Sequence, residues 1–169
     1  MNISETVEGL SRNERRLMLA LHAAGGCSTP EELIALFRAN TARRAGVTRN
    51  SPYLRLQALM KHCTSSGLGR ILGVRSPRGK LLWGMFVIET PGRTTMLFTA
   101  GSRKSRELRT SYLVIDHLIR SYAGTGQIID FAGSSIPSIA IFMRSFGGDK
   151  TTYWRLYRNN LPWPVKLLK

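Results

Sequence analysis

Acidic residues are scarce in this sequence of 169 residues, which holds 10 Asp and Glu against 25 Lys and Arg. The stretch between Glu32 and Glu89 contains no acidic residue, so all of its charge is carried by Lys and Arg. The formal net charge is +15, and such a surface attracts nucleic acid, nucleotide phosphates or an anionic membrane face. A merely solvated, arginine-rich face explains the charge equally well. No RNP-type or DNA-binding sequence motif accompanies it.

Cysteine and long apolar runs are nearly absent as well. Cys27 and Cys63 are the two cysteines, too few for a disulfide framework and without metal-ligand spacing. We therefore expect two buried thiols in a reducing cytoplasm and no metal. No apolar run approaches the roughly 20 residues that a membrane helix needs. The N-terminus, MNISETVEGLSRNERR, begins with acids and lacks the apolar stretch of a signal peptide. Together these absences predict a cytoplasmic protein without a transmembrane segment.

A hydrophobic content of 43% favours one globular domain over residues 1–169. Helix signals dominate residues 1–68: Ser11 and Thr29 are each followed three residues later by Glu, the spacing of a capping box. Ser51-Pro52 begins a further helix that Gly67 ends. Residues 69–158 have the pattern of a sheet with helices, and residues 159–169 form a Pro-broken tail.

The apolar period changes to that of strands after residue 68. Residues 70–74 form a short strand, and residues 80–89 are apolar on both alternating faces, so other elements should cover both. A turn at residues 90–92 makes a hairpin with a strand over residues 93–100, which a basic loop follows.

A helix follows this loop, with an apolar stripe from Leu108 to Tyr122. It leads to a strand over residues 127–130, a helix capped by Ser134 or Ser135, and a strand over residues 151–158. This order predicts an α/β fold with a mixed, mostly antiparallel sheet flanked by helices. The expected inward face of the helix after Ser135 comprises Ile136, Ile139, Ala140 and Met143.

The stretch IDFAGSSIPSIAIFMRSFGG, with the TTYWRL that follows shortly after it, resembles a GNAT-type N-acyltransferase domain. More narrowly, it resembles the Fem-type branch, related to the peptidoglycan interpeptide-bridge aminoacyltransferases. That branch shows an Asp-Phe-x-Gly-Ser strand exit, Ile-Pro in the next helix and Phe-Gly at its end. PEELIALFRANTARR and SYLVIDHLIRSYAG are similar to it too, so the resemblance covers residues 10–158.

The resemblance implies a GNAT-like fold and a transferase activity. The enzyme would move an acyl or aminoacyl group from acetyl-CoA, another acyl-CoA or aminoacyl-tRNA to an amine. Family members often carry two such domains, whereas this chain has room for one, so a partner domain or a homodimer is expected. The rival interpretation is a degenerate GNAT-like domain that binds RNA or protein without catalysis. A membrane-surface role is weaker, because no helix has a broad apolar face opposite a basic one.

GNAT domains hold the donor's pyrophosphate on a loop with the pattern Gln/Arg-x-x-Gly-x-Gly/Ala, at a helix N-terminus. The matching stretch runs from Arg106 to Ser111, with Arg109 in place of the central glycine. A cationic helix start opposes the macrodipole unless an anion lies there, which favours a phosphate over a solvated helix start. The residues expected to hold the donor are Arg103, Arg106, Arg109, Thr110 and Ser111, and Lys104 adds charge beside them.

The resemblance also implies candidates for the acyl transfer itself. Asp130, at a strand end, is either the base that takes the amine proton or an acid that caps the next helix or pairs with an arginine. Glu89 is a second base candidate or an ordinary residue before a turn.

Other positions concern the leaving group and the substrate. Many GNAT enzymes protonate the leaving group with a tyrosine where this chain has Phe142 and Met143, so Tyr153 is the substitute unless it only packs. Gly133 and Ser134 are expected at the substrate. Arg144 either steadies the oxyanion or is solvated.

Overall fold

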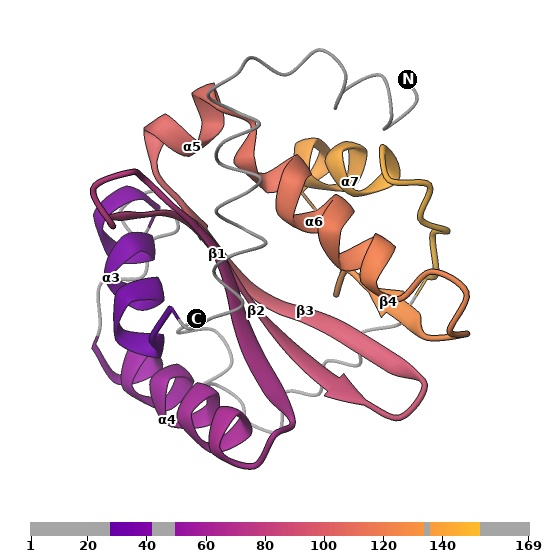
Figure 1. Ribbon diagram of the computed structural model, residues 1–169, viewed down its shortest axis with the longest axis horizontal. Helices are drawn as coiled ribbons and strands as arrows, with labels where there is room; N and C mark the ends of the chain where they lie inside the picture. Colours follow the sequence, from indigo (N-terminus) through magenta and orange to yellow (C-terminus); the bar gives the residue numbers. More distant parts are fainter. Residues whose placement is uncertain (1–27, 42–49, 134–135, 153–169) are drawn as a thin grey trace, which may run out of the picture.

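The computed structural model describes residues 28–41, 50–133 and 136–152. Its centre is a four-stranded sheet in the order β1-β2-β3-β4 (Figure 1). In chain order the described elements are α3 (Pro30–Asn40), α4 (Ser51–Ser65), β1 (Gly69–Arg75), β2 (Leu81–Thr90), β3 (Arg93–Gly101), α5 (Arg103–Glu107), α6 (Thr110–Ser121), β4 (Ile128–Asp130) and α7 (Pro137–Arg144).

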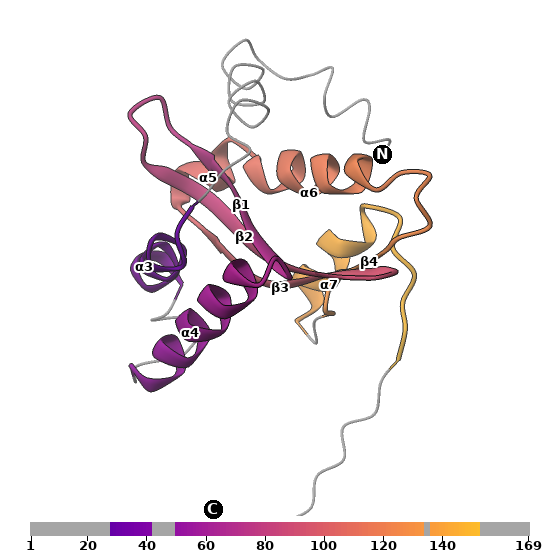
Figure 2. The ribbon, with the colours of Figure 1, turned by 60° about the horizontal axis from the view of Figure 1, so that its bottom comes forward.

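The helices form layers on both faces of the sheet. Helices α3 and α4 lie against one face, and α6 crosses the other (Figure 2). Strand β2 is the centre of this arrangement, because its first seven residues are all buried. Its Phe86 joins a core cluster with Leu33 and Met60 of α3 and α4, whereas Met85 joins a second cluster with Val114 of α6. The expectation that both faces of residues 80–89 are covered is therefore confirmed.

The sheet is mixed, as the sequence predicts. Strands β1, β2 and β3 are antiparallel neighbours, and β3 pairs with β4 in parallel through the crossover helix α6. The parallel ladder is short, running from the pair Arg93–Ile128 to the pair Thr95–Asp130.

Strand β3 carries a bulge just beyond this ladder. Phe86 lies opposite Phe98 and the next residue of β2, Val87, lies opposite Met96, so Leu97 is an extra residue in β3. Met96 packs in the α6 cluster, whereas Phe98 packs against the cluster under α3 and α4. Met96 and Phe98 would share a face in a regular strand, and the bulge places them on opposite faces of the sheet.

Two expectations need correction. The basic loop after residue 100 contains the short helix α5, because Ser102 caps it by accepting from the Ser105 N–H at 3.1 Å. The inward face expected for α7 is wrong: Ile136 and Ile139 are 54% and 38% exposed. Apart from Ser138 and Arg144 the helix is apolar, so more than one of its faces could be the inward one. Instead, Phe142 and Phe146 reach the core by packing on Tyr112 of α6.

Some predicted features stay as predictions. The helix at Ser11, Cys27, the strand over 151–158 and the tail over 159–169 fall wholly or mainly outside the described residues. Cys63 is a buried free thiol, as expected. Among the described helices, none is long and apolar enough to cross a membrane. The described ranges also contain no cluster of His, Cys, Asp and Glu suited to a metal ion.

Helix α3 is joined to the sheet by a capping box that also carries an ion pair. Thr29 and Glu32 exchange hydrogen bonds between side chain and backbone, as their spacing predicts. The same carboxylate accepts two hydrogen bonds from the Arg75 guanidinium, at 2.9 and 2.6 Å. Hydrogen bonding from Arg75, followed by the Thr29 backbone N–H, lowers the pKa of Glu32.

We predict that Glu32→Gln destabilises the fold at neutral pH by about 0.5–1 kcal/mol, a value reduced for the solvent exposure of the pair. Glutamine can still accept from the Thr29 N–H, so the lost stability measures the contribution of the negative charge alone. Because the folded pKa is lowered, the charged pair stabilises fully above the ordinary value of 4.5 and stops doing so as pH falls through the folded value. Urea unfolding of both proteins between pH 7 and pH 3 should therefore converge. A difference that is equal at all pH values would contradict the assignment.

Candidate functional site

The candidate site begins at the open half of β3. Strand β4 ends at Asp130, opposite Thr95, so within the described part of the chain β3 has no strand partner on that side from Met96 onward. An unpaired strand edge presents backbone N–H and C=O groups that an extended ligand can pair with. Leu97, the bulged residue, lies at the start of this open edge and is 40% exposed. The two parallel strands thus leave an opening beside the second half of β3.

The N-terminus of α6 follows this open edge in the chain. Arg109 precedes the helix in the left-handed conformation, with φ 50°, and no side chain caps the helix. The first N–H groups of a helix have no acceptor inside it, and they bind anions readily when no side chain caps them. A left-handed residue is most easily glycine. The structure therefore keeps a glycine-like backbone at the position where Arg109 replaces the glycine of the donor loop.

The side chains around this helix start are cationic. Arg103 pairs with Glu107 at 3.3 Å on the exposed face of α5. Lys104, Arg106 and Arg109 are exposed, and no carboxylate of the described residues lies within ion-pair distance of them.

The two hydroxyl residues of the loop differ in exposure. Thr110 is fully buried, and its hydroxyl donates to the Ser105 carbonyl at 3.3 Å. Ser111 is partly exposed. The predicted donor residues therefore gather at one helix start with an excess of positive charge.

Asp130 lies at the end of β4 with both carboxylate oxygens engaged. Oδ2 accepts from the Arg93 guanidinium at 2.8 Å, and Oδ1 accepts from the Ala132 backbone N–H at 2.8 Å. Ala132 and Gly133 are both left-handed, with φ 57° and 64°. The carboxylate thus fixes the tight turn out of β4 while staying about one-third exposed. Its arginine partner is one of the two alternatives that the sequence leaves open, and it does not exclude a role as base.

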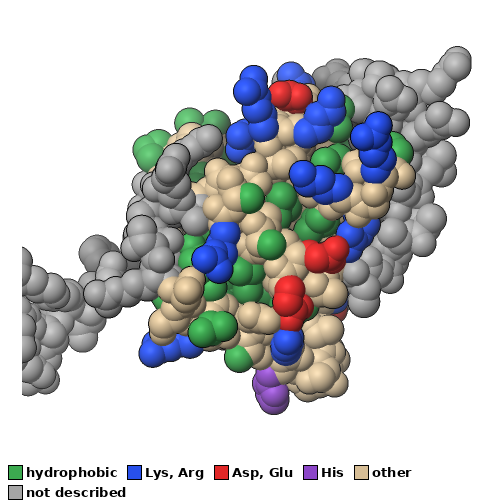
Figure 3. All heavy atoms as spheres, turned by 90° about the vertical axis from the view of Figure 1, so that its left-hand side faces the viewer, with side chains coloured by type: hydrophobic (Ala, Val, Ile, Leu, Met, Phe, Trp, Pro, Cys, Tyr) green, Lys and Arg blue, Asp and Glu red, His purple; other side chains and the backbone are tan. Residues whose placement is uncertain are grey.

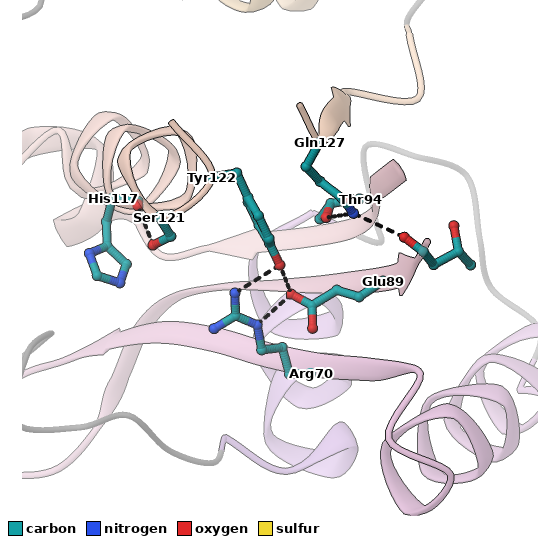
Figure 4. A network of polar contacts seen from close by, with 8 residues as sticks. Arg70, Glu89, Thr94, His117, Ser121, Tyr122 and Gln127 are labelled. Carbon is teal, nitrogen blue, oxygen red and sulfur yellow. Dashed lines mark hydrogen bonds and ion pairs between the residues drawn. The ribbon is translucent and has the colours of Figure 1, made fainter. Parts of the chain in front are cut away.

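Glu89 belongs to a different polar network, shown in Figure 4. Its Oε1 accepts from Arg70 Nε at 2.7 Å and from the Tyr122 hydroxyl, and Arg70 also donates to Tyr122 at 3.3 Å. Partial burial lowers the pKa of Arg70, but the hydrogen bonds from its guanidinium to Glu89 and Tyr122 outweigh this effect and raise it overall. This network joins β1, β2 and the end of α6, at the opposite end of that helix from Arg109.

The register places the two candidate bases on opposite faces of the sheet. Glu89 lies opposite Thr94 of β3, and Asp130 lies opposite the next residue, Thr95. Successive residues of a strand point to opposite faces. Glu89 accordingly reaches Tyr122 on the α6 face, whereas Asp130 lies on the other face. One reaction centre cannot use both carboxylates directly.

Helix α7 closes the side of the site with an aromatic cluster. Tyr112, in the first turn of α6, contacts Phe142 edge-on at 4.9 Å between ring centroids and Phe146 at 5.5 Å. Arg144 is exposed in the last turn of α7. Ser134 and Tyr153 lie outside the described residues.

Sequence reasoning missed three residues. Arg93, the partner of Asp130, is 37 positions away and carries no local signal. Tyr122 and Tyr112 read as members of an apolar stripe, but each also brings a hydroxyl group. Leucine would pack equally well on such a stripe. The presence of tyrosine there is the only sequence signal for a polar role of these two residues.

We predict that Arg109→Gly leaves the free energy of unfolding unchanged or raises it by up to about 1 kcal/mol, because glycine has no penalty in the left-handed conformation. The matched control is Arg106→Gly, which removes the same side chain from helix α5 and should cost about 1 kcal/mol. Urea unfolding measures both. Equal losses in the two variants would show that Arg109 does not need a left-handed backbone.

The comparison with protein families bears on this geometry. Residues 6–135 match the profile of the acetyltransferase (GNAT) domain. Among solved structures, a mutant of the BH1408 protein from Bacillus halodurans aligns with a TM-score of 0.50 and 17% identity, over 77% of this chain and 97% of that chain. At this identity the likeness concerns the fold, and no curated protein matches the sequence. Because the profile covers well over half of its residues, the chain belongs to the GNAT acetyltransferase domain family.

Proposed function

We propose that the protein is an N-acyltransferase that moves an acyl or aminoacyl group from a phosphate-bearing donor to an amine. Family membership supports acyl transfer in general. The observation that carries the proposal is the uncapped N-terminus of α6 behind the left-handed Arg109, next along the chain after the open edge of β3. A strand edge that leads to an anion-binding helix start suits a long donor with an acyl group at one end and phosphates at the other.

Donor binding follows from this layout. An extended arm of the donor pairs with the backbone of β3 from Met96 onward, and its phosphates lie at the N-terminus of α6 beside Ser111. Arg103, Arg106 and Arg109 add charge-assisted hydrogen bonds. Acetyl-CoA, another acyl-CoA and aminoacyl-tRNA all carry the required phosphates, so each is a candidate donor.

The amine must lose a proton before it can attack the acyl carbon. We assign this step to Asp130, which lies where β3 and β4 separate and is accessible to solvent. Its carboxylate takes the proton directly or through a water molecule. Its bonds to Arg93 and to the Ala132 N–H hold it in place, and positioning of donor and amine supplies most of the remaining catalysis. Glu89, paired with Arg70 on the opposite face, is the weaker candidate.

The leaving group and the oxyanion need donors as well. The family's tyrosine position holds Phe142 or Met143, neither of which can donate a proton. We propose Tyr112 beside Tyr153 for this role, because its ring contacts Phe142 and so brings a phenol to the same cluster from the other helix. Arg144 at the end of α7 is proposed to steady the oxyanion, and Gly133 and Ser134 to contact the substrate.

The narrower assignment to the bridge-aminoacyltransferase branch is also a proposal. It is supported by the turn after β4, where Asp130 binds the Ala132 N–H and the left-handed Gly133 follows. This geometry gives a physical reason for the Asp-Phe-x-Gly-Ser pattern, because the acid fixes the turn and the glycine accepts its conformation. On this assignment the donor is an aminoacyl-tRNA and the amine belongs to a peptidoglycan precursor.

A second candidate function is a basic binding module without catalysis. Two features favour it: Arg109 replaces the loop glycine, and the tyrosine position of α7 has no hydroxyl. Such a module would bind RNA or protein through the basic surface. Binding of a donor without transfer to any amine would support this candidate over the enzyme.

We predict that the protein binds acetyl-CoA or coenzyme A in calorimetry and that Arg106→Ala weakens binding about tenfold, since one charge-assisted contact is lost. The matched control is Arg55→Ala on α4, which should leave binding unchanged. Titration of aminoacyl-tRNA at two salt concentrations identifies the other donor class. Failure of every phosphate-bearing donor to bind would refute the proposed function.

We predict that Asp130→Asn lowers the turnover rate about 100-fold or more at pH 7 and leaves the KM of the donor unchanged, as expected for loss of a general base. Arg93→Met is the matched control, because it breaks the same ion pair but keeps the carboxylate. Release of free thiol from acetyl-CoA with a panel of amines measures the rate. Equal losses in both variants would mean that Asp130 acts only through its ion pair.

A further inference from the structure

The cationic surface extends beyond the start of α6. The turn between β1 and β2 carries Arg78 and Lys80, both exposed. This turn lies beside α5, because Arg75 pairs with Leu81 in the sheet and the Ser102 N–H donates to the Leu82 carbonyl at 2.8 Å. Lys and Arg side chains gather at this end of the molecule in the space-filling view (Figure 3). We define the basic ridge as Arg78, Lys80, Arg103, Lys104, Arg106 and Arg109.

Little negative charge compensates the ridge. Glu107 pairs with Arg103, and Glu32 is already engaged by Arg75. Arg78 and Lys80, like Lys104, Arg106 and Arg109, have no carboxylate within ion-pair distance in the ranges that the structure describes. Like charges held side by side repel each other, and a bound polyanion relieves that repulsion.

The ridge is longer than a single donor's phosphates require. Arg103, Arg106 and Arg109 surround the helix start at which a pyrophosphate is proposed to bind. Arg78 and Lys80 lie outside this loop, on a turn held by the bonds of Ser76 with the backbone of Gly79 and Lys80. They take no part in those bonds through their side chains, so their charges are available to a ligand.

We propose that the basic ridge binds the phosphodiester backbone of a nucleic acid, with Arg78 and Lys80 as contacts separate from the donor loop. For Arg103, Arg106 and Arg109 this inference rests on the proposed function, because these residues also belong to the donor loop. For Arg78 and Lys80 it is independent of the proposed function. Recognition is of successive phosphates, because the ridge carries charge without aromatic side chains for base stacking. Its affinity therefore falls steeply with salt.

The test measures fluorescence anisotropy of a labelled single-stranded RNA of 24 nucleotides, with the DNA strand of the same sequence as a second probe. The key variant is Arg78→Glu with Lys80→Glu. Its matched control is Arg55→Glu with Lys150→Glu, which lowers the net charge equally through exposed residues outside the ridge. Thermal unfolding verifies that both variants are folded.

We expect RNA affinity of the ridge variant to fall about tenfold or more at 0.1 M salt, while the control retains most of it. The slope of log K against log salt should shrink by about 1.4, as expected for two lost contacts to a single strand. The ratio of RNA to DNA affinity shows which of the two nucleic acids the ridge prefers. Equal losses in the two variants, or no salt-dependent binding by the unchanged protein, would overturn the proposal. So would binding to vesicles with anionic lipid but not to either strand.

Coenzyme A binding separates this proposal from the proposed function. The ridge variant should bind coenzyme A as the unchanged protein does, because Arg78 and Lys80 lie outside the donor loop. Ridge-dependent RNA binding by a protein that neither binds coenzyme A nor transfers an aminoacyl group from aminoacyl-tRNA would sustain the ridge and refute the enzyme. Coenzyme A binding without RNA binding would sustain the proposed function and refute the ridge.

Discussion

The brevity of the parallel pairing between β3 and β4 is the constraint on which the candidate site depends. Only the pairs from Arg93–Ile128 to Thr95–Asp130 are formed, and the Arg93–Asp130 ion pair links the first of these pairs to the last. A longer ladder would cover the backbone of β3 from Met96 onward and leave no edge for a ligand. A shorter one would leave Asp130 without a fixed place. Ending the ladder at this point gives both an anchored carboxylate and an open strand.

The structure shows where part of the positive charge of the molecule gathers. Composition alone allows a solvated face as well as a ligand-binding one, because it does not place side chains in space. The fold brings the β1–β2 turn and the helices after β3 to one end of the sheet, although Arg78 and Arg103 are far apart in sequence. Most acids of the described residues outside the ridge pair with a Lys or Arg that is also outside it, as Glu32 does with Arg75. Cations without an ion pair occur elsewhere too, such as Arg55 and Lys150, but among the described residues the ridge holds several of them together.

Much of the fold could be predicted from the sequence because its signals are local. The capping box at Thr29 and Glu32, the turn before Gly92 and the doubly apolar β2 each depend on a few neighbouring residues. The inward face of α7 was predicted wrongly, because apolar side chains lie on several sides of this helix. Contacts with Tyr112 decide its orientation instead. The partners of Asp130 and Glu89 could not be predicted either, since pairs such as Arg93–Asp130 depend on strand register across the crossover.

The bulge at Leu97 shifts the alternation of side chains along β3 by one residue. Before it, Met96 faces α6; after it, Phe98 faces α3 and α4. Deletion of Leu97 would make Met96 and Phe98 neighbours, and regular alternation would keep them, and Ala100, on the faces that they occupy now. The bulge is thus what allows β3 to hold one residue more than its partner without turning Phe98 and Ala100 to the α6 face. In an alignment of related chains, a gap at this position would therefore indicate a strand without the kink beside β4, but with the same side chains on each face of the sheet.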